Sequence, residues 1–164
     1  PRWMQIEFSR SVQKQAESEG GEMDSFTIRR MFEAQYLDVP KGWKIQEYDI
    51  HRGKGSAGDG LVEAQVVYGD ELSSATVTGT GEGAMSAIAN AIKAAAGFSI
   101  DIEDYNEYAI ESGVGANALA CIRATVEGEQ VSAASLGVDT SEAMLQALMS
   151  VAGRYMAVRE VKAA

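Results

Sequence analysis

The sequence contains few of the residues on which covalent cross-links and metal clusters depend. Among its 164 residues there are one cysteine, Cys121, and one histidine, His51. A single cysteine cannot form a disulfide within the chain, and it cannot build a cysteine metal cluster. This scarcity excludes a disulfide-stapled domain and fits a reducing compartment, so we expect a cytoplasmic protein.

Long apolar runs and an excess of positive charge are also missing. No stretch approaches the roughly 20 apolar residues of a membrane-spanning helix, and no signal peptide is visible. The net charge is -10, and residues 53–164 carry 15 acidic against 6 basic side chains. Such a surface repels phosphate groups, so we expect neither nucleic acid nor a membrane as a partner. The chain begins at Pro1 without a methionine, which we interpret as part of a longer protein.

The residues that carry catalysis are too few for an active site. His51 lies between acidic and basic neighbours on a predicted strand edge, and no second histidine is available for a nucleophile–base pair. Cys121 lies in an alternating strand and is predicted to be packed or at an interface. Four carboxylates crowd one strand, but neighbouring strand residues point to opposite faces and cannot all bind one ion: Asp101, Glu103, Asp104 and Glu107. The sequence therefore predicts neither catalytic residues nor a metal site.

Residues 79–84 (GTGEGA) lie between a predicted strand and a predicted helix, as a dinucleotide-binding turn does. That turn requires a parallel crossover, whereas this strand is the return arm of a hairpin with Ser or Thr at alternate positions. We interpret the glycines as permitting close packing of strand against helix. The N–H groups at the helix start remain suited to a carboxylate or phosphate, as do those near Thr140 and Ser141. A nucleotide-binding fragment is a remote alternative.

Apolar spacing divides the chain into a helical part and a repeated part. Residues 3–18 have the period of an amphipathic helix that ends at Gly20, and a second helix begins at Asp24 or Ser25 and ends at Pro40. From there the period changes to that of strands. We predict a helical subdomain over 1–42 and a second domain over 43–164.

The second domain contains one unit written twice, over 43–97 and 98–158. The first copy predicts strands at 43–51, 62–68 and 75–79 and a helix at 83–96; the second predicts strands at 98–110, 116–127 and 131–137 and a helix at 141–158. A unit of roughly 55 residues buries its own core poorly, so the copies must share one, with a symmetric crevice suited to a small ligand. The predicted fold is α+β: two βββα repeats packed as a pseudo-symmetric antiparallel sheet and helix sandwich, preceded by two short helices.

Four segments carry a family resemblance: residues 1–9 (PRWMQIEFS), 79–83 (GTGEG), 104–109 (DYNEYA) and 116–118 (ANA). In this order and spacing they resemble the C-terminal part of 2-isopropylmalate synthase, over essentially the whole chain. The resemblance implies a helical subdomain followed by a regulatory domain that forms a homodimer and binds leucine for feedback inhibition. It also implies a catalytic barrel in the same polypeptide, an acyltransferase using acetyl-CoA, 2-oxoisovalerate and a divalent metal. This chain lacks the barrel and is expected to be inactive alone, with no cofactor of its own.

The resemblance also implies the residues that line the leucine site. By their place in the motifs these are Gly81, Gly83, Ala84, Met85, Ile102, Tyr105, Ala109, Ala116, Asp139 and Thr140. Glu82 and Ala84 stand where the family often has Asn and Pro, which makes the turn looser and more negative. Two alternatives stay open: the isoleucine-sensing domain of citramalate synthase, and a dimerisation module without a ligand.

Overall fold

The computed structural model describes residues 1–53, 60–110 and 117–163, and the chain divides into two compact units, residues 1–38 and 39–164. No helix in these described ranges is both long enough and apolar enough to cross a membrane.

The first unit is a helical hairpin held by aromatic side chains. Helix α1 (Arg2–Glu19) ends at Gly20 with the left-handed backbone that glycine adopts readily, and α2 (Ser25–Phe32) begins at Asp24, whose carboxylate accepts from Thr27 N. The predicted second helix changes character at Phe32 and continues as a π-helix, η1 (Glu33–Leu37). Phe8, Phe32 and Tyr36 pack ring against ring, and the Tyr36 hydroxyl donates to Glu7 Oε1 at 3.0 Å. Burial beside Glu7 raises the pKa of Tyr36.

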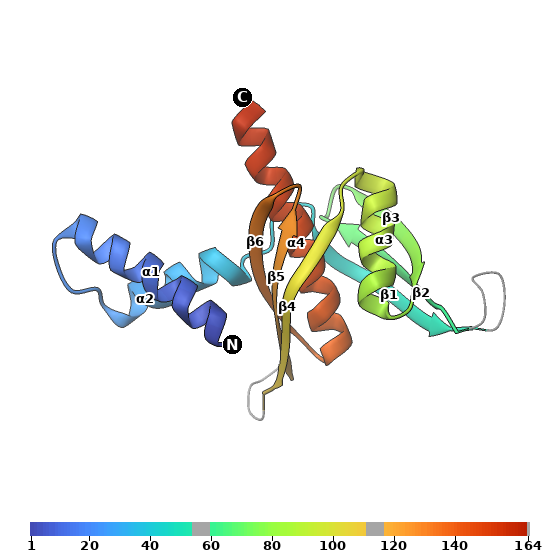
Figure 1. Cartoon of the computed structure of the whole chain (residues 1–164), viewed down its shortest axis with the longest axis horizontal. Coiled ribbons are helices and arrows are strands. Elements are labelled where there is room, and N and C mark those ends of the chain that lie inside the picture. The colour runs from blue at the N-terminus through green and yellow to red at the C-terminus, as the bar shows by residue number, and fades with distance from the viewer. Residues whose placement is uncertain (54–59, 111–116, 164) are drawn as a thin grey trace. The chain divides into compact units, whose positions relative to one another are not determined.

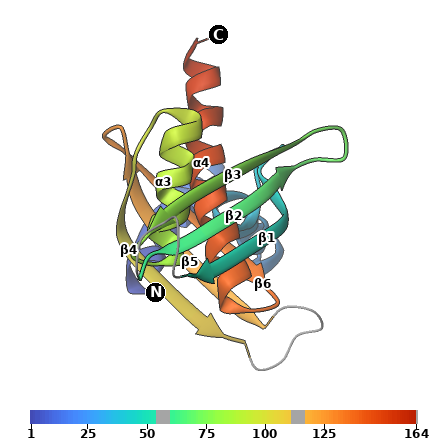
Figure 2. The same ribbon diagram turned by 90° about the vertical axis from the view of Figure 1, so that its right-hand side faces the viewer.

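The second unit contains two separate three-stranded antiparallel sheets (Figure 1, Figure 2). The strands, in sheet order, are β1 (Lys44–Arg52), β2 (Val62–Gly69) and β3 (Ser74–Gly81) in one sheet, and β4 (Ile100–Ala109), β5 (Ala118–Val126) and β6 (Glu129–Gly137) in the other. Helix α3 (Ala84–Ala96) follows the first sheet and α4 (Thr140–Ala163) follows the second. The predicted α+β fold with two βββα repeats is therefore confirmed.

One hydrophobic core joins the two repeats. Alternate residues of the central strands β2 and β5, such as Val66 and Ile122, are fully buried and pack with apolar residues of both helices. Helix α3 packs against β2 and β3, whereas α4 packs against β5 and β6 and also reaches β1 of the other repeat. Figure 1 shows α4 between the two sheets. The repeats share a core, as the short length of each copy predicts.

The two repeats match in strand register as well as in element order. The first strand of each carries a bulge at the corresponding place, between Ile45 and Glu47 in β1 and between Ile102 and Asp104 in β4. Tyr48 pairs with Val66 in one sheet, and Tyr105 pairs with Ile122 in the other. The helices differ in length, with 13 residues in α3 and 24 in α4. Helix α4 continues beyond its predicted end at residue 158, and Lys162 in this extension forms an ion pair with Glu129.

Candidate functional site

Glycines at the ends of β3 and β6 let each helix approach its sheet closely. A Cβ atom at Gly79 would lie 2.2 Å from Ala87 O, and one at Gly137 would lie 2.5 Å from Ala143 N. No side chain fits at such distances, so both positions require glycine. This confirms the packing role for Gly79 and Gly81 of residues 79–84, but not for Gly83, where an added Cβ would meet nothing within 4 Å. The dinucleotide turn is excluded, because β3 and β4 lie in different sheets and form no parallel crossover.

Gly83 is the N-cap residue of helix α3 and offers no side chain to cap it. The Gly83 N–H donates to Ser86 Oγ at 3.1 Å, and the Ser86 hydroxyl donates back to Gly83 O. The N–H groups of Ala84 and Met85 lie in the first helical turn, where no intrahelical acceptor exists. This helix start therefore keeps donors for an anion, as the sequence predicts.

A cavity of about 560 Å³ lies between the first turns of α3 and the beginning of β4. Its lining residues are Gly83, Met85, Ser86, Ala89, Asn90, Ile100, Asp101 and Ile102. Gly83, Met85 and Ile102 are among the residues predicted for the leucine site. Apolar walls with a few polar groups, and a volume of this order, are typical of small-ligand sites.

The other cavity-lining residues were missed by sequence reasoning, although part of the signal was present. Ser86, Ala89 and Asn90 recur at helical spacing on one face of α3, and Ile100 alternates with Ile102 along β4. Helical spacing identifies such a face but does not say which strand lies opposite it. The opposition of α3 to β4 depends on how the repeats pack together.

The other described residues predicted in the first copy and on β4 do not line this cavity. Gly81 ends β3, and Ala84 begins α3 and packs against the core. Tyr105 is half-buried against the core, and its hydroxyl donates to Glu107 Oε2 at 2.7 Å. Burial and this hydrogen bond raise the pKa of Tyr105. Ala109, the last residue of β4, is exposed, and Ala116 lies outside the described residues.

Asp139 and Thr140, predicted to join the site from the second copy, lie at the start of α4. Asp139 Oδ1 accepts from Glu142 N at 2.8 Å, which caps the helix. The Tyr48 hydroxyl of β1 donates to Asp139 Oδ2 at 3.4 Å. Neither Asp139 nor Thr140 lines the cavity at α3. The structure thus places the described predicted residues at the start of α3, along β4 and at the start of α4.

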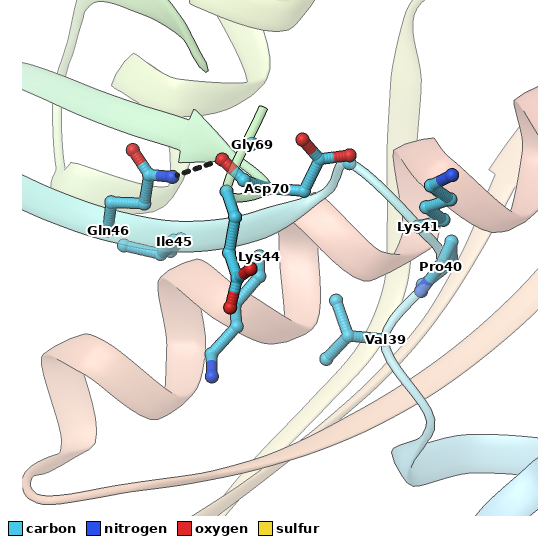
Figure 3. A pocket seen from close by; sticks show the side chains of 10 residues that line it. Val39, Pro40, Lys41, Lys44, Ile45, Gln46, Gly69 and Asp70 are labelled. Atoms are coloured by element: carbon cyan, nitrogen blue, oxygen red, sulfur yellow. Dashed lines mark hydrogen bonds between the residues drawn. The ribbon is translucent and has the colours of Figure 1, made fainter. Parts of the chain in front are cut away.

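A second hollow, of about 540 Å³, lies beside the turn between β2 and β3 (Figure 3). It is bounded by residues 39–42, by Lys44, Ile45 and Gln46, and by Gly69, Asp70 and Glu71. Gln46 Nε2 donates to Asp70 O at 3.1 Å, the dashed line in Figure 3, and the Asp70 carboxylate accepts from Leu72 N and Ser73 N. These backbone donors lower the pKa of Asp70. The carboxylate stabilises the turn, and no predicted site residue lines this hollow.

Neither His51 nor Cys121 lines the cavity at α3. His51 is exposed on β1, with Nδ1 at 3.3 Å from Asp49 Oδ2 and Nε2 at 3.5 Å from Glu63 Oε1. Cys121 is buried, and burial raises the pKa of its thiol, which opposes nucleophilic use. Within the described ranges, no group of three or more His, Cys, Asp or Glu side chains is arranged to hold a metal ion.

Comparison with known proteins agrees with this arrangement. The sequence matches the LeuA allosteric (dimerisation) domain over residues 22–156. The 2-isopropylmalate synthase of Alcanivorax borkumensis is 38% identical over 161 residues, covering 98% of this chain and 28% of that protein. That of Thermobifida fusca is 34% identical over 155 residues, covering 94% and 26%. That of Corynebacterium glutamicum (strain ATCC 13032) is 30% identical over 158 residues, covering 96% and 25%.

The chain therefore spans about a quarter of the length of the relatives that it matches. Its two βββα repeats, its shared core and its family match agree with one another. The chain belongs to the LeuA allosteric (dimerisation) domain family, and it is similar to part of the 2-isopropylmalate synthases.

Proposed function

We propose that this chain senses leucine and transmits feedback inhibition to the catalytic barrel of a 2-isopropylmalate synthase. The observation that supports this most strongly is the cavity between α3 and β4, because it contains Gly83, Met85 and Ile102 from the predicted site. The names of the relatives favour leucine over isoleucine as the effector.

The proposed site matches the chemistry of a zwitterionic amino acid with an apolar side chain. The N–H groups at the start of α3 would donate hydrogen bonds to the ligand carboxylate, which a helix N-terminus favours electrostatically. Met85, Ala89 and Ile102 would contact the aliphatic side chain. The other predicted residues, apart from Asp139 and Thr140 at the start of α4, are proposed to complete the site.

The remaining functions are proposed for the longer polypeptide. The barrel would carry the acyl transfer from acetyl-CoA to 2-oxoisovalerate and would hold the divalent metal, and this chain alone would be inactive. We propose that the regulatory domain also forms a homodimer and works in the cytoplasm, where its relatives' biosynthetic reaction would take place. Leucine would bias the two repeats toward one arrangement, which is the differential binding that allostery requires.

Calorimetric titration of the purified chain tests the proposal. Leucine should bind saturably, and isoleucine, valine and a nicotinamide nucleotide should bind more weakly or not at all. Tighter binding of isoleucine would assign the chain to the citramalate synthase type of sensor. Absence of binding by every amino acid would leave the dimerisation module without a ligand. Binding of the nucleotide alone would contradict the proposed sensor.

A further inference from the structure

The two repeats correspond residue by residue where each helix faces the first strand of the other repeat. Gly83 and Asp139 hold the same position, because the carbonyl of each accepts from the N–H four residues later, at Ala87 and Ala143. When the two repeats are aligned by their matching bulges, Ile45 corresponds to Ile102 and Tyr48 corresponds to Tyr105. The α3–β4 cavity therefore has a counterpart between α4 and β1.

That counterpart is filled by a side chain of the protein itself. Gln146 of α4 is only 7% exposed. Its Oε1 accepts from Ile45 N at 2.8 Å, and its Nε2 donates to Trp43 O at 3.1 Å. A side-chain amide thus satisfies one donor and one acceptor on the edge of β1. Removing it would leave both backbone groups without their partner.

The residue of α3 that corresponds to Gln146 is Asn90, which does not make this bridge. Asn90 is one methylene shorter, and its Nδ2 donates to Thr80 O at 2.9 Å, within its own repeat. The cavity is lined by Asn90 and by Ile100 and Ile102, the β4 residues that correspond to Trp43 and Ile45. The cavity therefore occupies the place that Gln146 fills in the other repeat.

The starts of α3 and α4 also differ in whether a side chain of the protein occupies them. At α4 the Asp139 carboxylate accepts from Glu142 N and from the Tyr48 hydroxyl. At α3 the corresponding Gly83 has no side chain, and the corresponding Tyr105 hydroxyl donates to Glu107 instead. One helix start is occupied by a carboxylate of the chain, and the other is left to an external carboxylate.

We propose that the duplicated domain contains two equivalent ligand positions, of which the α4–β1 position is permanently closed by Gln146 and Asp139. Because these two side chains occupy the strand edge and the helix start, only the α3–β4 position stays open, and each chain binds one ligand. Ile102 N–H and Ile100 C=O supply the ligand with one donor and one acceptor, as Ile45 N–H and Trp43 C=O supply Gln146. Asn90 and Gly83 keep the position open. This inference rests on the proposed function for the identity of the ligand, leucine.

Two substitutions transfer the closing groups to the open position. Asn90→Gln restores the longer amide, and Gly83→Asp restores the carboxylate at a position where an added Cβ meets nothing within 4 Å. Each variant should bind leucine about tenfold more weakly or worse, since it replaces ligand hydrogen bonds with internal ones. Lys93→Gln, at an exposed residue of α3 that does not line the cavity, is the control and should bind within about threefold of the parent chain. Wild-type chain should bind one leucine per chain.

Amide hydrogen exchange measured by NMR tests the open and closed positions without any ligand. Ile45 N–H should exchange more slowly than Ile102 N–H, and Asn90→Gln should slow exchange at Ile102. Equal protection of the two amides in the wild-type chain, two leucines per chain, or undiminished binding by folded Asn90→Gln and Gly83→Asp would overturn the inference. A chain that binds no leucine but shows the predicted exchange pattern would contradict the proposed function alone.

Discussion

At the scale of single residues, the absence of a side chain has opposite consequences at neighbouring glycines. Gly79 lies against the backbone of α3, where a Cβ atom would be 2.2 Å from Ala87 O. Gly83 has extended backbone with φ of -146° and open space around it. Glycine is thus required for packing at the first position and leaves room for a ligand at the second.

Substitution by alanine separates these two roles. We expect Gly79→Ala to lower the free energy of unfolding by about 3 kcal/mol, because the clash is with backbone that cannot rotate away. Gly83→Ala, the matched control, should change it by about 0.5 kcal/mol or less. Urea unfolding followed by circular dichroism measures both. Equal losses from the two variants would contradict the packing argument.

Ionisation of tyrosine side chains is expected to lower the stability of the folded protein at alkaline pH. The pKa of Tyr105 is raised above its ordinary 10.0 by burial and by Glu107, so the folded state holds the phenol proton more tightly than the unfolded state does. The stabilisation is fully present below pH 10.0 and is lost as pH rises above it, because the unfolded chain then binds fewer protons.

We therefore expect the free energy of unfolding to fall as pH rises above 10.0, and Tyr105→Phe to reduce the steepness of that fall. The measurement is a series of urea unfolding curves across the alkaline range, with both proteins in the same buffers. Tyr36 and Tyr48, whose pKa values are also raised, should maintain part of the slope in the variant. Identical slopes for the two proteins would refute the assignment to Tyr105.

At the scale of elements, α3 and α4 occupy equivalent places but make different contacts with the strand opposite. Helix α4 bonds to the β1 backbone through Gln146, whereas α3 leaves a cavity beside β4. The duplicated element has therefore become structural in one copy and available to a ligand in the other.

This difference predicts unequal stability costs. Gln146→Ala should destabilise the domain by about 2 kcal/mol, because the partly buried Ile45 N–H and Trp43 C=O lose their partner. Asn90→Ala should cost about 1 kcal/mol or less, because Asn90 is exposed and makes one hydrogen bond. Thermal unfolding of both variants measures the difference. A larger loss from Asn90→Ala would contradict the correspondence between the two positions.

Sequence patterns predicted the elements better than their assembly. Strict alternation in β2 and helical spacing in α3 are local signals, and both elements formed where they were expected. Two separate sheets and the opposition of α3 to β4 depend on contacts between distant segments, which periodicity does not encode. For the same reason Met85 and Ile102 were identified as candidate site residues whereas Asn90 was not, since its role depends on being one methylene shorter than Gln146.

At the scale of the whole molecule, the chain combines a helical unit with a duplicated regulatory unit. The proposed homodimer would join two of these domains, which fits a family described as a dimerisation domain. Sedimentation analysis at micromolar concentration should find a homodimer, and its mass should not change in the Gly83→Asp variant, since Gly83 is assigned to the ligand site. A monomer at that concentration would contradict the proposed dimerisation.

The most direct test of the account is a calorimetric titration of the wild-type chain with leucine. Leucine should bind saturably, one per chain, and more strongly than isoleucine or valine, because the cavity of about 560 Å³ between α3 and β4 receives it. The absence of heat and of any thermal shift with all three amino acids would contradict the account.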